Sequence, residues 1–194
     1  MIESSSQIIV IAGPNGAGKT TLAPSLLRDW LGLLEYVNAD AIAQGLSAFQ
    51  PEEVAFKAGR VMLGRLRELA TKGENFAFET TLATRSYAPW LRELCQQGYR
   101  LHISFVWLRS PEMAIQRVRD RVVTGGHDIP EETIRRRYVK GVRNFFALYR
   151  PLASSWIVYD NSSLSQPLKL ATGEQTVENI IEPALWKEFC EVSK

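Results

Sequence analysis

Five short apolar runs mark out the chain, and polar or turn-forming stretches separate them. The runs cover residues 8–11, 36–37, 76–78, 101–108 and 156–159. Short runs that are rich in β-branched and aromatic residues are typical of strands buried on both faces of a parallel sheet. The pattern therefore predicts five strands at these positions.

The stretches between the runs carry apolar residues at helical spacing. Three of them begin with a proline, a residue suited to the first helical position because that position needs no N–H group: Pro51, Pro111 and Pro130. Strands that alternate with helices favour an α/β fold with a mostly parallel five-stranded sheet and right-handed crossovers. Ligands of such sheets bind at the carboxyl ends of the strands, so the residues that end each run are the first candidates for a site.

The chain after Asp160 follows a different pattern. A polar loop leads to a short apolar run at residues 168–171, and Thr172 and Gly173 indicate a turn. Helical spacing then returns, interrupted by Pro183, at Val177, Ile180, Ile181, Leu185 and Phe189. We predict that this last segment is a helical packing element.

The residues after the first run read GPNGAGKTT and satisfy the pattern G-x-x-x-x-G-K-[ST] of a P-loop. Glycines let backbone N–H groups point at a phosphate, and the N-terminus of the following helix adds the positive end of its dipole. Lys19 can reach the β- and γ-phosphates, while the Thr20 hydroxyl can ligate Mg²⁺. The alternative is a glycine-rich turn with a chance lysine, but a strand precedes the loop and a helix follows it. We predict a three-layer P-loop NTPase fold that binds ATP or GTP through Gly13, Pro14, Asn15, Gly16, Ala17, Gly18, Lys19, Thr20 and Thr21.

Length and composition limit the remaining choices. A chain of 194 residues with 45% hydrophobic content can form one globular domain, and we expect no second one. Cys95 and Cys190 lie far apart, so neither a disulfide framework nor a zinc site is expected. The start of the chain is polar, and no apolar run approaches the length of a membrane span. We expect a cytoplasmic protein without a membrane partner.

A P-loop can serve a motor, a switch or a transfer of phosphate. Transporter and motor ATPases usually have an apolar strand that ends in an acidic pair, together with a signature such as LSGGQ, and a GTPase switch has N-K-x-D. None of these occurs here, and the longest apolar run ends at Arg109 and Ser110. Transfer to an acceptor remains, which predicts a P-loop kinase domain over residues 1–194.

A kinase needs an acidic residue beside the acceptor hydroxyl. Asp40 ends the second run and is the candidate base, with a helix N-cap as the alternative role. Glu79 and Thr81 follow the third run and are candidates to bind acceptor hydroxyls. Threonine is also common at strand ends for structural reasons, so both readings of Thr81 stay open.

Basic charge is concentrated between Arg109 and Arg150, where ten Lys/Arg stand against five Asp/Glu, although the whole chain carries only +2. Within a lid segment of about residues 112–145, Gly125 and Gly126 separate two helices that carry Arg117, Arg121, Arg135, Arg136 and Arg137. Such helices can move arginines onto a triphosphate, which stabilises the transferred group and excludes water. One alternative is a solvated basic helix. Another is a nucleotide-regulated binding protein whose basic lid grips RNA or another anionic partner, although no aromatic platform is interleaved with the arginines.

Two histidines complete the set of candidates. His127 lies in the turn between the two lid helices and is a minor candidate for contact with nucleotide or substrate. His102 lies within a predicted strand, where a packing role is expected.

In this order, the motifs GPNGAGKTT, VNAD, FAFETT and R-V-x-x-R-V-x-x-G-G-H-x-I-P-x-x-x-I-x-R-R-Y resemble those of the zeta toxin family of P-loop kinases over residues 8–161. Better studied zeta toxins phosphorylate a sugar hydroxyl of UDP-N-acetylglucosamine, and a small helical antitoxin holds them inactive. The resemblance therefore implies a small-molecule acceptor and an antitoxin partner. The chain after Asn161 departs from the family, so the acceptor of a short member need not be UDP-N-acetylglucosamine.

The resemblance also implies roles for individual residues. Lys19 and Thr20 would hold ATP and Mg²⁺, and Asp40 would be the base. Glu79 and Thr81 would contact the sugar nucleotide. The phosphates would be clamped by Arg121 together with Arg136 or Arg137, which the motif does not distinguish.

Overall fold

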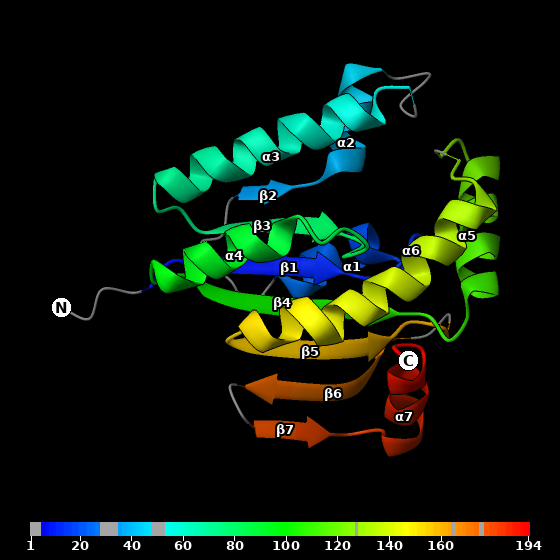
Figure 1. Ribbon diagram of the computed structural model, residues 1–194. Coiled ribbons are helices and arrows are strands. Elements are labelled where there is room, and N and C mark those ends of the chain that lie inside the picture. The colour runs from blue at the N-terminus through cyan, green and yellow to red at the C-terminus, as the bar shows by residue number, and fades with distance from the viewer. Residues whose placement is uncertain (1–4, 28–34, 48–52, 127, 164–165, 175–176) are drawn as a thin grey trace.

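The computed structural model describes residues 5–27, 35–47, 53–126, 128–163, 166–174 and 177–194. Its centre is one seven-stranded sheet in the order β2-β3-β1-β4-β5-β6-β7 (Figure 1). The first five strands in that order are parallel: β2 (Glu35–Val37), β3 (Phe76–Thr80), β1 (Gln7–Ala12), β4 (Arg100–Trp107) and β5 (Ser155–Asp160). This confirms the predicted α/β fold and its five parallel strands.

The register of the parallel strands determines which residues meet at their carboxyl ends. β1 lies between β3 and β4, and Ile11 pairs with Glu79 while Ala12 pairs with Thr80. β2 runs along the other edge of β3, with Val37 opposite Phe78. Because parallel strands end at one edge of the sheet, the loops that follow β1, β2 and β3 emerge side by side.

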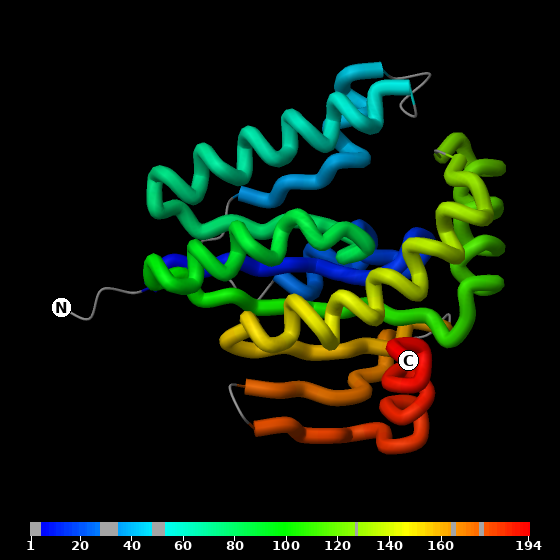
Figure 2. Tube along the Cα trace, viewed as in Figure 1, coloured from blue at the N-terminus to red at the C-terminus, as the bar shows by residue number. Residues whose placement is uncertain are grey.

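Helices cover the sheet: α1 (Lys19–Leu26), α2 (Ala39–Leu46), α3 (Ala55–Thr71), α4 (Tyr87–Gln96), α5 (Pro111–Val123), α6 (Glu131–Asn144) and α7 (Pro183–Glu191). A π-helical turn (Phe145–Tyr149) and a 3-10 turn (Arg150–Leu152) link α6 to β5. α4 and α6 lie in front of the sheet and α1 lies behind it, and the trace in Figure 2 follows the same three layers. Within the described ranges, no helix combines the length and the apolar character that a membrane crossing requires.

Two of the three prolines that were expected to begin helices do lie at helix starts. α5 begins at Pro111, and the Ser110 side chain caps it by accepting a hydrogen bond from the Met113 N–H group at 3.2 Å. Pro130 stands one residue before α6 rather than inside it, a difference of the size expected at helix ends. Pro51 lies outside the described residues, and the nearest described helix, α3, begins at Ala55.

The chain after β5 differs from the prediction. Thr172 and Gly173 do not form a turn but belong to β6 (Leu168–Glu174). The segment that was predicted to be helical from Val177 begins instead with a strand, β7 (Val177–Ile180). Both strands add to the sheet in antiparallel fashion. Pairing with β5 outweighed the local pattern because it satisfies a row of backbone groups that a helix would have to satisfy alone. Gly173 fits because a Cβ there would overlap the Trp156 ring.

An aromatic cluster joins this C-terminal part to the parallel sheet. Phe189 of α7 lies 5.3 Å from Phe105 of β4 between ring centroids, and Trp186 stacks on Trp156 of β5 at 5.5 Å. Phe145 completes the cluster, 5.1 Å from Phe105. Burial of large aromatic side chains is among the strongest contributions to a core. The predicted packing role is confirmed for α7, which starts at Pro183, but it is wrong for Val177, Ile180 and Ile181, whose side chains are exposed.

Candidate functional site

The loop between β1 and α1 has the backbone that the motif requires. Gly13, Gly16 and Gly18 all have positive φ angles, of 140°, 74° and 83°. A Cβ at Gly13 would overlap the Val106 carbonyl oxygen, so only glycine fits there. Lys19 begins α1 with a side chain that is 7% exposed, and its Nζ donates to the Pro14 carbonyl at 2.9 Å. The loop is therefore closed around its own lysine, with a helix N-terminus beneath it.

A second anchor of the loop comes from far along the chain. The Asn161 side chain, just after β5, donates from Nδ2 to the Ala17 carbonyl at 2.8 Å. The Asn161 N–H group donates in turn to the Trp107 carbonyl at 2.9 Å. Sequence reasoning missed this residue, because no local pattern links it to a loop 144 residues away. The end of β5 thus holds the P-loop in place.

Glu79 is the centre of the site. Its Oε2 atom accepts hydrogen bonds from the Thr20 hydroxyl at 2.8 Å, the Tyr36 hydroxyl at 2.7 Å and the Asn38 amide at 2.9 Å. Lys19 Nζ lies 3.7 Å from the other oxygen, Oε1. One carboxylate therefore joins the P-loop to β2 and β3.

Tyr36 and Asn38 are site residues that the sequence analysis did not identify. They stand two apart at the end of β2, and a spacing of two puts both side chains on one face of a strand. That alternation was the available signal. Burial, and next the charge of Glu79, raise the pKa of the Tyr36 hydroxyl, so Tyr36 stays protonated and can donate to the carboxylate.

Burial and neighbouring charges have opposite effects on the pKa of Lys19. Burial lowers the pKa of Lys19 and is the largest effect, while the negative charges of Glu79 and Asp40 raise it. The positive charge of Arg121 lowers it further, to a smaller extent. A lysine in such a position gains most from an additional anion, as a bound phosphate would be.

Asp40 is not the N-cap of its helix. Asn38 holds that position in α2, where its Oδ1 accepts from the Asp40 N–H group at 2.7 Å and the Ala41 N–H group at 3.3 Å. The capping alternative for Asp40 is therefore wrong, because a residue two positions earlier satisfies the end of the helix. The Asp40 carboxylate lies in the first turn of α2, exposed, and faces a cleft.

The cleft has a volume of about 530 Å³ and lies between α3, α6 and the carboxyl ends of β2 and β3. Its α3 wall is made of small or flexible side chains, Ala55, Gly59 and Met62. The opposite wall follows β3 and includes Thr80 and Thr84. Of the site residues predicted from the sequence, the cleft brings together Asn15, Lys19, Asp40, Glu79, Thr81, Arg136 and Arg137.

The lid arginines do not all face this cleft. Arg137 is half-buried, its Nη1 lies 3.5 Å from Asn15 Oδ1, and burial followed by the neighbouring Arg136 charge lowers its pKa. Arg121 lines a smaller adjoining pocket of about 90 Å³ together with Asp40. Arg117 lies on the other side of the P-loop, where its Nη2 donates to the Ser162 carbonyl at 3.1 Å.

The sequence also predicted two further P-loop residues, Gly16 and Thr21, and the lid residue His127. Thr21 is exposed on α1. The Gly16 backbone packs so closely on α5 that a Cβ would lie 2.7 Å from the Ala114 carbonyl oxygen. His127 lies outside the described residues.

The outward-facing arginines of the lid helices are paired with acids. Arg119 of α5 forms an ion pair with Glu131, and Arg135 of α6 forms one with Glu112. Both pairs connect the two helices to each other. Much of the basic charge of this segment is therefore neutralised on its outer side.

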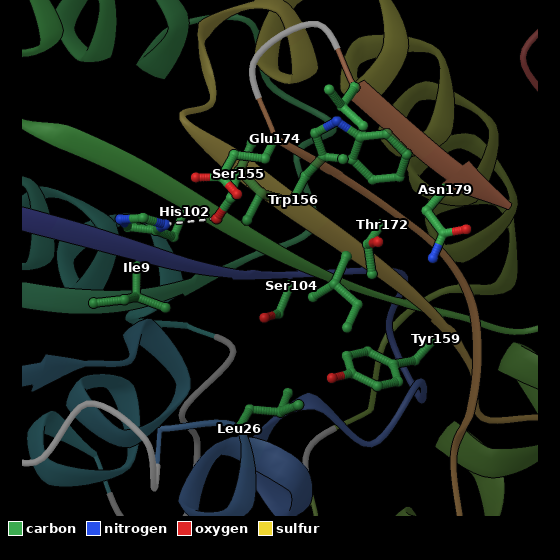
Figure 3. Close-up of a pocket in the computed structure, with 14 residues that line it drawn as sticks. Ile9, Leu26, His102, Ser104, Ser155, Trp156, Tyr159, Thr172, Glu174 and Asn179 are labelled. Atoms are coloured by element: carbon green, nitrogen blue, oxygen red, sulfur yellow. Dashed lines mark hydrogen bonds between the residues drawn. The ribbon is translucent and has the colours of Figure 1, made fainter. Parts of the chain in front are cut away.

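A second pocket, of about 430 Å³, lies on the opposite face of the sheet, beside α1 (Figure 3). There the His102 ring forms two hydrogen bonds of 2.7 Å each. Its Nδ1 atom is bonded to the Ser155 hydroxyl, and its Nε2 atom is bonded to Gln7 Oε1. Burial, assisted by Arg100, lowers the pKa of His102 to about 4. The histidine joins β1, β4 and β5 as a neutral side chain, so its predicted packing role is confirmed.

Comparison with known structures agrees with the observed fold. A chain in the crystal structure of AvrRxo1-ORF1:-ORF2 with ATP superposes with a TM-score of 0.75 at 12% identity, covering 99% of this chain. The present chain spans only 64% of that one. The PezAT toxin-antitoxin system of Streptococcus pneumoniae gives a TM-score of 0.62 at 16% identity, covering 98% of this chain and 85% of that one. A gluconokinase from Sinorhizobium meliloti 1021 gives 0.51 at 16% identity, covering 97% and 91%.

Sequence comparison gives the family. A protein of Haemophilus influenzae (strain ATCC 51907 / DSM 11121 / KW20 / Rd), named only as an uncharacterized protein, is 27% identical over 133 residues, which cover 69% of this chain and 93% of that protein. Residues 8–138, more than half of the chain, match a family model described as an AAA domain. With its P-loop and its kinase-like fold, the chain belongs to this AAA domain family.

Proposed function

We propose that the protein is an ATP-dependent kinase that transfers the γ-phosphate to a hydroxyl group of a small molecule. The observation that supports this best is the shared cleft. It holds a phosphate-binding lysine, a candidate base and lid arginines: Lys19, Asp40, Arg136 and Arg137. Phosphoryl transfer depends mainly on positioning and on charge stabilisation, and these residues supply both.

The donor half of the reaction falls to the P-loop. The Lys19 side chain and backbone N–H groups of residues 13–21, apart from Pro14, would hold the phosphates of ATP. Thr20 and Glu79 offer a hydroxyl and a carboxylate 2.8 Å apart, and oxygen ligands of this kind suit Mg²⁺. Bound with the nucleotide, Mg²⁺ would neutralise phosphate charge. Because Glu79 already accepts three hydrogen bonds on one oxygen, we infer that it serves the metal side more than the acceptor hydroxyl.

The acceptor half falls to Asp40. Its exposed carboxylate in the cleft would accept the proton of the acceptor hydroxyl, and Thr81 would add a neutral hydrogen bond. Arg121, which shares the smaller pocket with Asp40, and Arg137 would stabilise the transferred group. Arg136 lies in the same cleft, and Arg117 would act from the far side of the P-loop.

We further propose that residues 112–145 act as a lid on a single kinase domain. The segment comprises most of α5, all of α6 and the turn between them. Closure would bring its arginines onto the nucleotide and exclude water from the transfer. An ATP-dependent reaction and two free cysteines, Cys95 and Cys190, fit the cytoplasm.

A zeta-toxin-like role is the more specific form of the proposal. UDP-N-acetylglucosamine is then the first acceptor to try, and a small antitoxin protein is the expected partner. The PezAT and AvrRxo1 structures, which are a toxin-antitoxin system and a complex of two gene products, support this direction through their fold alone.

The RNA-binding alternative has less support. A protein that grips a nucleic acid backbone needs exposed cations without intramolecular partners. Arg119 and Arg135, on the outer side of the lid helices, are already paired with Glu131 and Glu112. Arg136, Arg137 and Lys140 line a cleft that is better suited to a small molecule.

The test is incubation of the protein with Mg-ATP and a panel of UDP-sugars, nucleosides and small metabolites, with mass spectrometry for a phosphorylated product. In Asp40→Asn we expect kcat to fall about a hundred- to thousandfold, because a general base is lost, while ATP affinity stays within about twofold. Full activity in Asp40→Asn would exclude Asp40 as the base. ATP binding without any phosphorylated product would count against the kinase.

A further inference from the structure

One helix of the lid carries three cations into the cleft. Arg136, Arg137 and Lys140 of α6 all line it. Arg136 and Lys140 are four residues apart and share one face of the helix, whereas Arg137 points about a quarter-turn away. The sequence motifs singled out the arginines but not Lys140.

The three cations differ in what they contact. Arg137 lies against Asn15 of the P-loop, so its position is at the donor end of the cleft. Over the ranges that the structure describes, Arg136 and Lys140 form neither a side-chain hydrogen bond nor an ion pair. By contrast, Arg143 on the same helix donates to the Lys194 carbonyl at 3.0 Å, and Arg135 is paired with Glu112.

Lys140 is placed beside the acceptor wall by its neighbour. A Cβ on Gly141 would overlap the Thr81 carbonyl oxygen, so α6 touches the backbone that follows β3 at this point. Thr81 and Lys140 therefore border the same end of the cleft. Along α6 the cations run from the P-loop, at Arg137, to the loop that carries the proposed acceptor contact.

The acids of the cleft do not balance these cations. Among the described residues the lining acids are Asp40 and Glu79. Glu79 is engaged with the P-loop lysine and three hydrogen-bond donors, and Asp40 adjoins Arg121 in the smaller pocket. Like charges held close together disfavour each other unless an anion lies between them. Position separates the cations further: Lys19 and Arg137 contact the P-loop, where a nucleotide would bind, whereas Lys140 adjoins the α6 contact with Thr81.

We propose that Arg136 and Lys140 form an anion subsite for the acceptor. This rests on the proposed kinase function and narrows it: the acceptor is a hydroxyl compound that also carries a phosphate or carboxylate group, and not a neutral sugar or alcohol. The anionic group lies against Arg136 and Lys140 while the hydroxyl reaches Asp40. The small residues Ala55 and Gly59 leave room for it on the α3 side.

The test compares matched neutral and anionic acceptors: uridine with uridine monophosphate, N-acetylglucosamine with N-acetylglucosamine 1-phosphate, and glucitol with gluconate. Acceptor binding is measured by calorimetry on protein loaded with Mg²⁺ and a non-hydrolysable ATP analogue, and phosphorylation is measured separately by mass spectrometry. We expect only anionic members to bind. The carboxylate pair tells whether a carboxylate suffices or a phosphate is required.

Substitutions in α6 test whether Lys140 binds the anionic group of the acceptor. In Lys140→Gln the Kd and KM for the anionic acceptor should rise about tenfold, as expected for the loss of a hydrogen bond to a charged group, while KM for ATP is unchanged. Lys140→Arg should retain most of the affinity. The matched control is Arg143→Gln, which removes one positive charge from the same helix outside the cleft and should leave both constants unchanged.

The outcomes separate the two proposals. If neutral and anionic acceptors bind and react equally, or if Lys140→Gln binds as the unchanged protein does, the anion subsite is wrong and the kinase stands. If anionic compounds bind through Lys140 but no compound is phosphorylated, the subsite stands and the kinase fails. If none of the probes binds, the subsite is wrong.

Discussion

The two halves of the cleft are built differently. In the donor half, the side chains of Lys19 and Glu79 are 7% and 10% exposed. Glu79 accepts hydrogen bonds from Thr20, Tyr36 and Asn38, so the polar groups there already have partners. In the acceptor half, Arg136 and Lys140 are exposed, and the Thr81 hydroxyl accepts a long hydrogen bond, 3.4 Å, from the Ala83 N–H group.

This difference has a physical meaning. A site whose dipoles and charges are already oriented loses little free energy in reorganisation when its ligand arrives. The donor half is of this kind and suits a ligand of constant shape, the phosphate chain of a nucleotide. In the acceptor half, the cations gain an anionic partner only when a ligand binds, so the charge of the ligand determines which compound binds.

The largest effect is expected from Lys19→Ala in the donor half. The change removes the cation at the phosphates and leaves Glu79 with one charged neighbour fewer, so kcat/KM for ATP should fall by about a thousandfold or more. Steady-state kinetics with the acceptor found by mass spectrometry measures this. If Lys19→Ala kept more than a tenth of the activity, the donor half would not be where ATP reacts.

A smaller effect is expected from Tyr36→Phe, which removes one of the three hydrogen bonds to Glu79 Oε2 without changing the shape of the side chain. The free energy of unfolding should fall by about 1 kcal/mol, the usual contribution of one hydrogen bond. Denaturant titration measures the stability, and nucleotide binding at graded Mg²⁺ concentrations measures the second expected result, a higher Mg²⁺ requirement. Unchanged Mg²⁺ dependence would mean that Glu79 does not serve the metal. Tyr87→Phe, at the acceptor end of the same cleft, is the matched control.

The smallest effect on activity is expected at His102, on the other face of the sheet. Its folded pKa of about 4 lies below its ordinary value of 6.5, so protons favour the unfolded chain. The stability that this difference contributes is complete above pH 6.5 and is lost as the pH falls towards 4. This difference amounts to about 2 kcal/mol between pH 7 and 5, so the Tm should drop by about 4–8 °C more in the unchanged protein than in His102→Gln. Kinase activity of His102→Gln at pH 7 should be normal; reduced activity would connect the two faces.

The sequence predicted the parts of the site that are encoded locally. The glycines of the P-loop and Lys19 stand within eight residues of one another, and a strand and a helix flank them, so their geometry follows from backbone rules. The five parallel strands were found for the same reason, since each is a continuous apolar run. The roles of Asp40 and the lid arginines remain predictions, because position in a cleft does not measure chemistry.

What the sequence did not predict depends on contacts between distant segments. β6 and β7 were missed because each becomes a strand only beside a partner: Leu168–Glu174 pairs with the edge of β5, and Val177–Ile180 then pairs with β6. Asn161 and Tyr36 were missed for a related reason: each acts on a residue that only the register of the parallel sheet brings near.

The local order of residues therefore determined the phosphate-binding loop, the alternation of strands and helices, and the types of side chain at the strand ends. Only the tertiary structure decided that Asn38 and not Asp40 caps α2, that Glu79 joins the P-loop to β2, and that Lys140 faces the cleft whereas Arg135 is paired outside it. The reason is physical: backbone conformation responds to near neighbours, whereas hydrogen-bond partners and the neutralisation of charge depend on which surfaces the packed sheet and helices bring together.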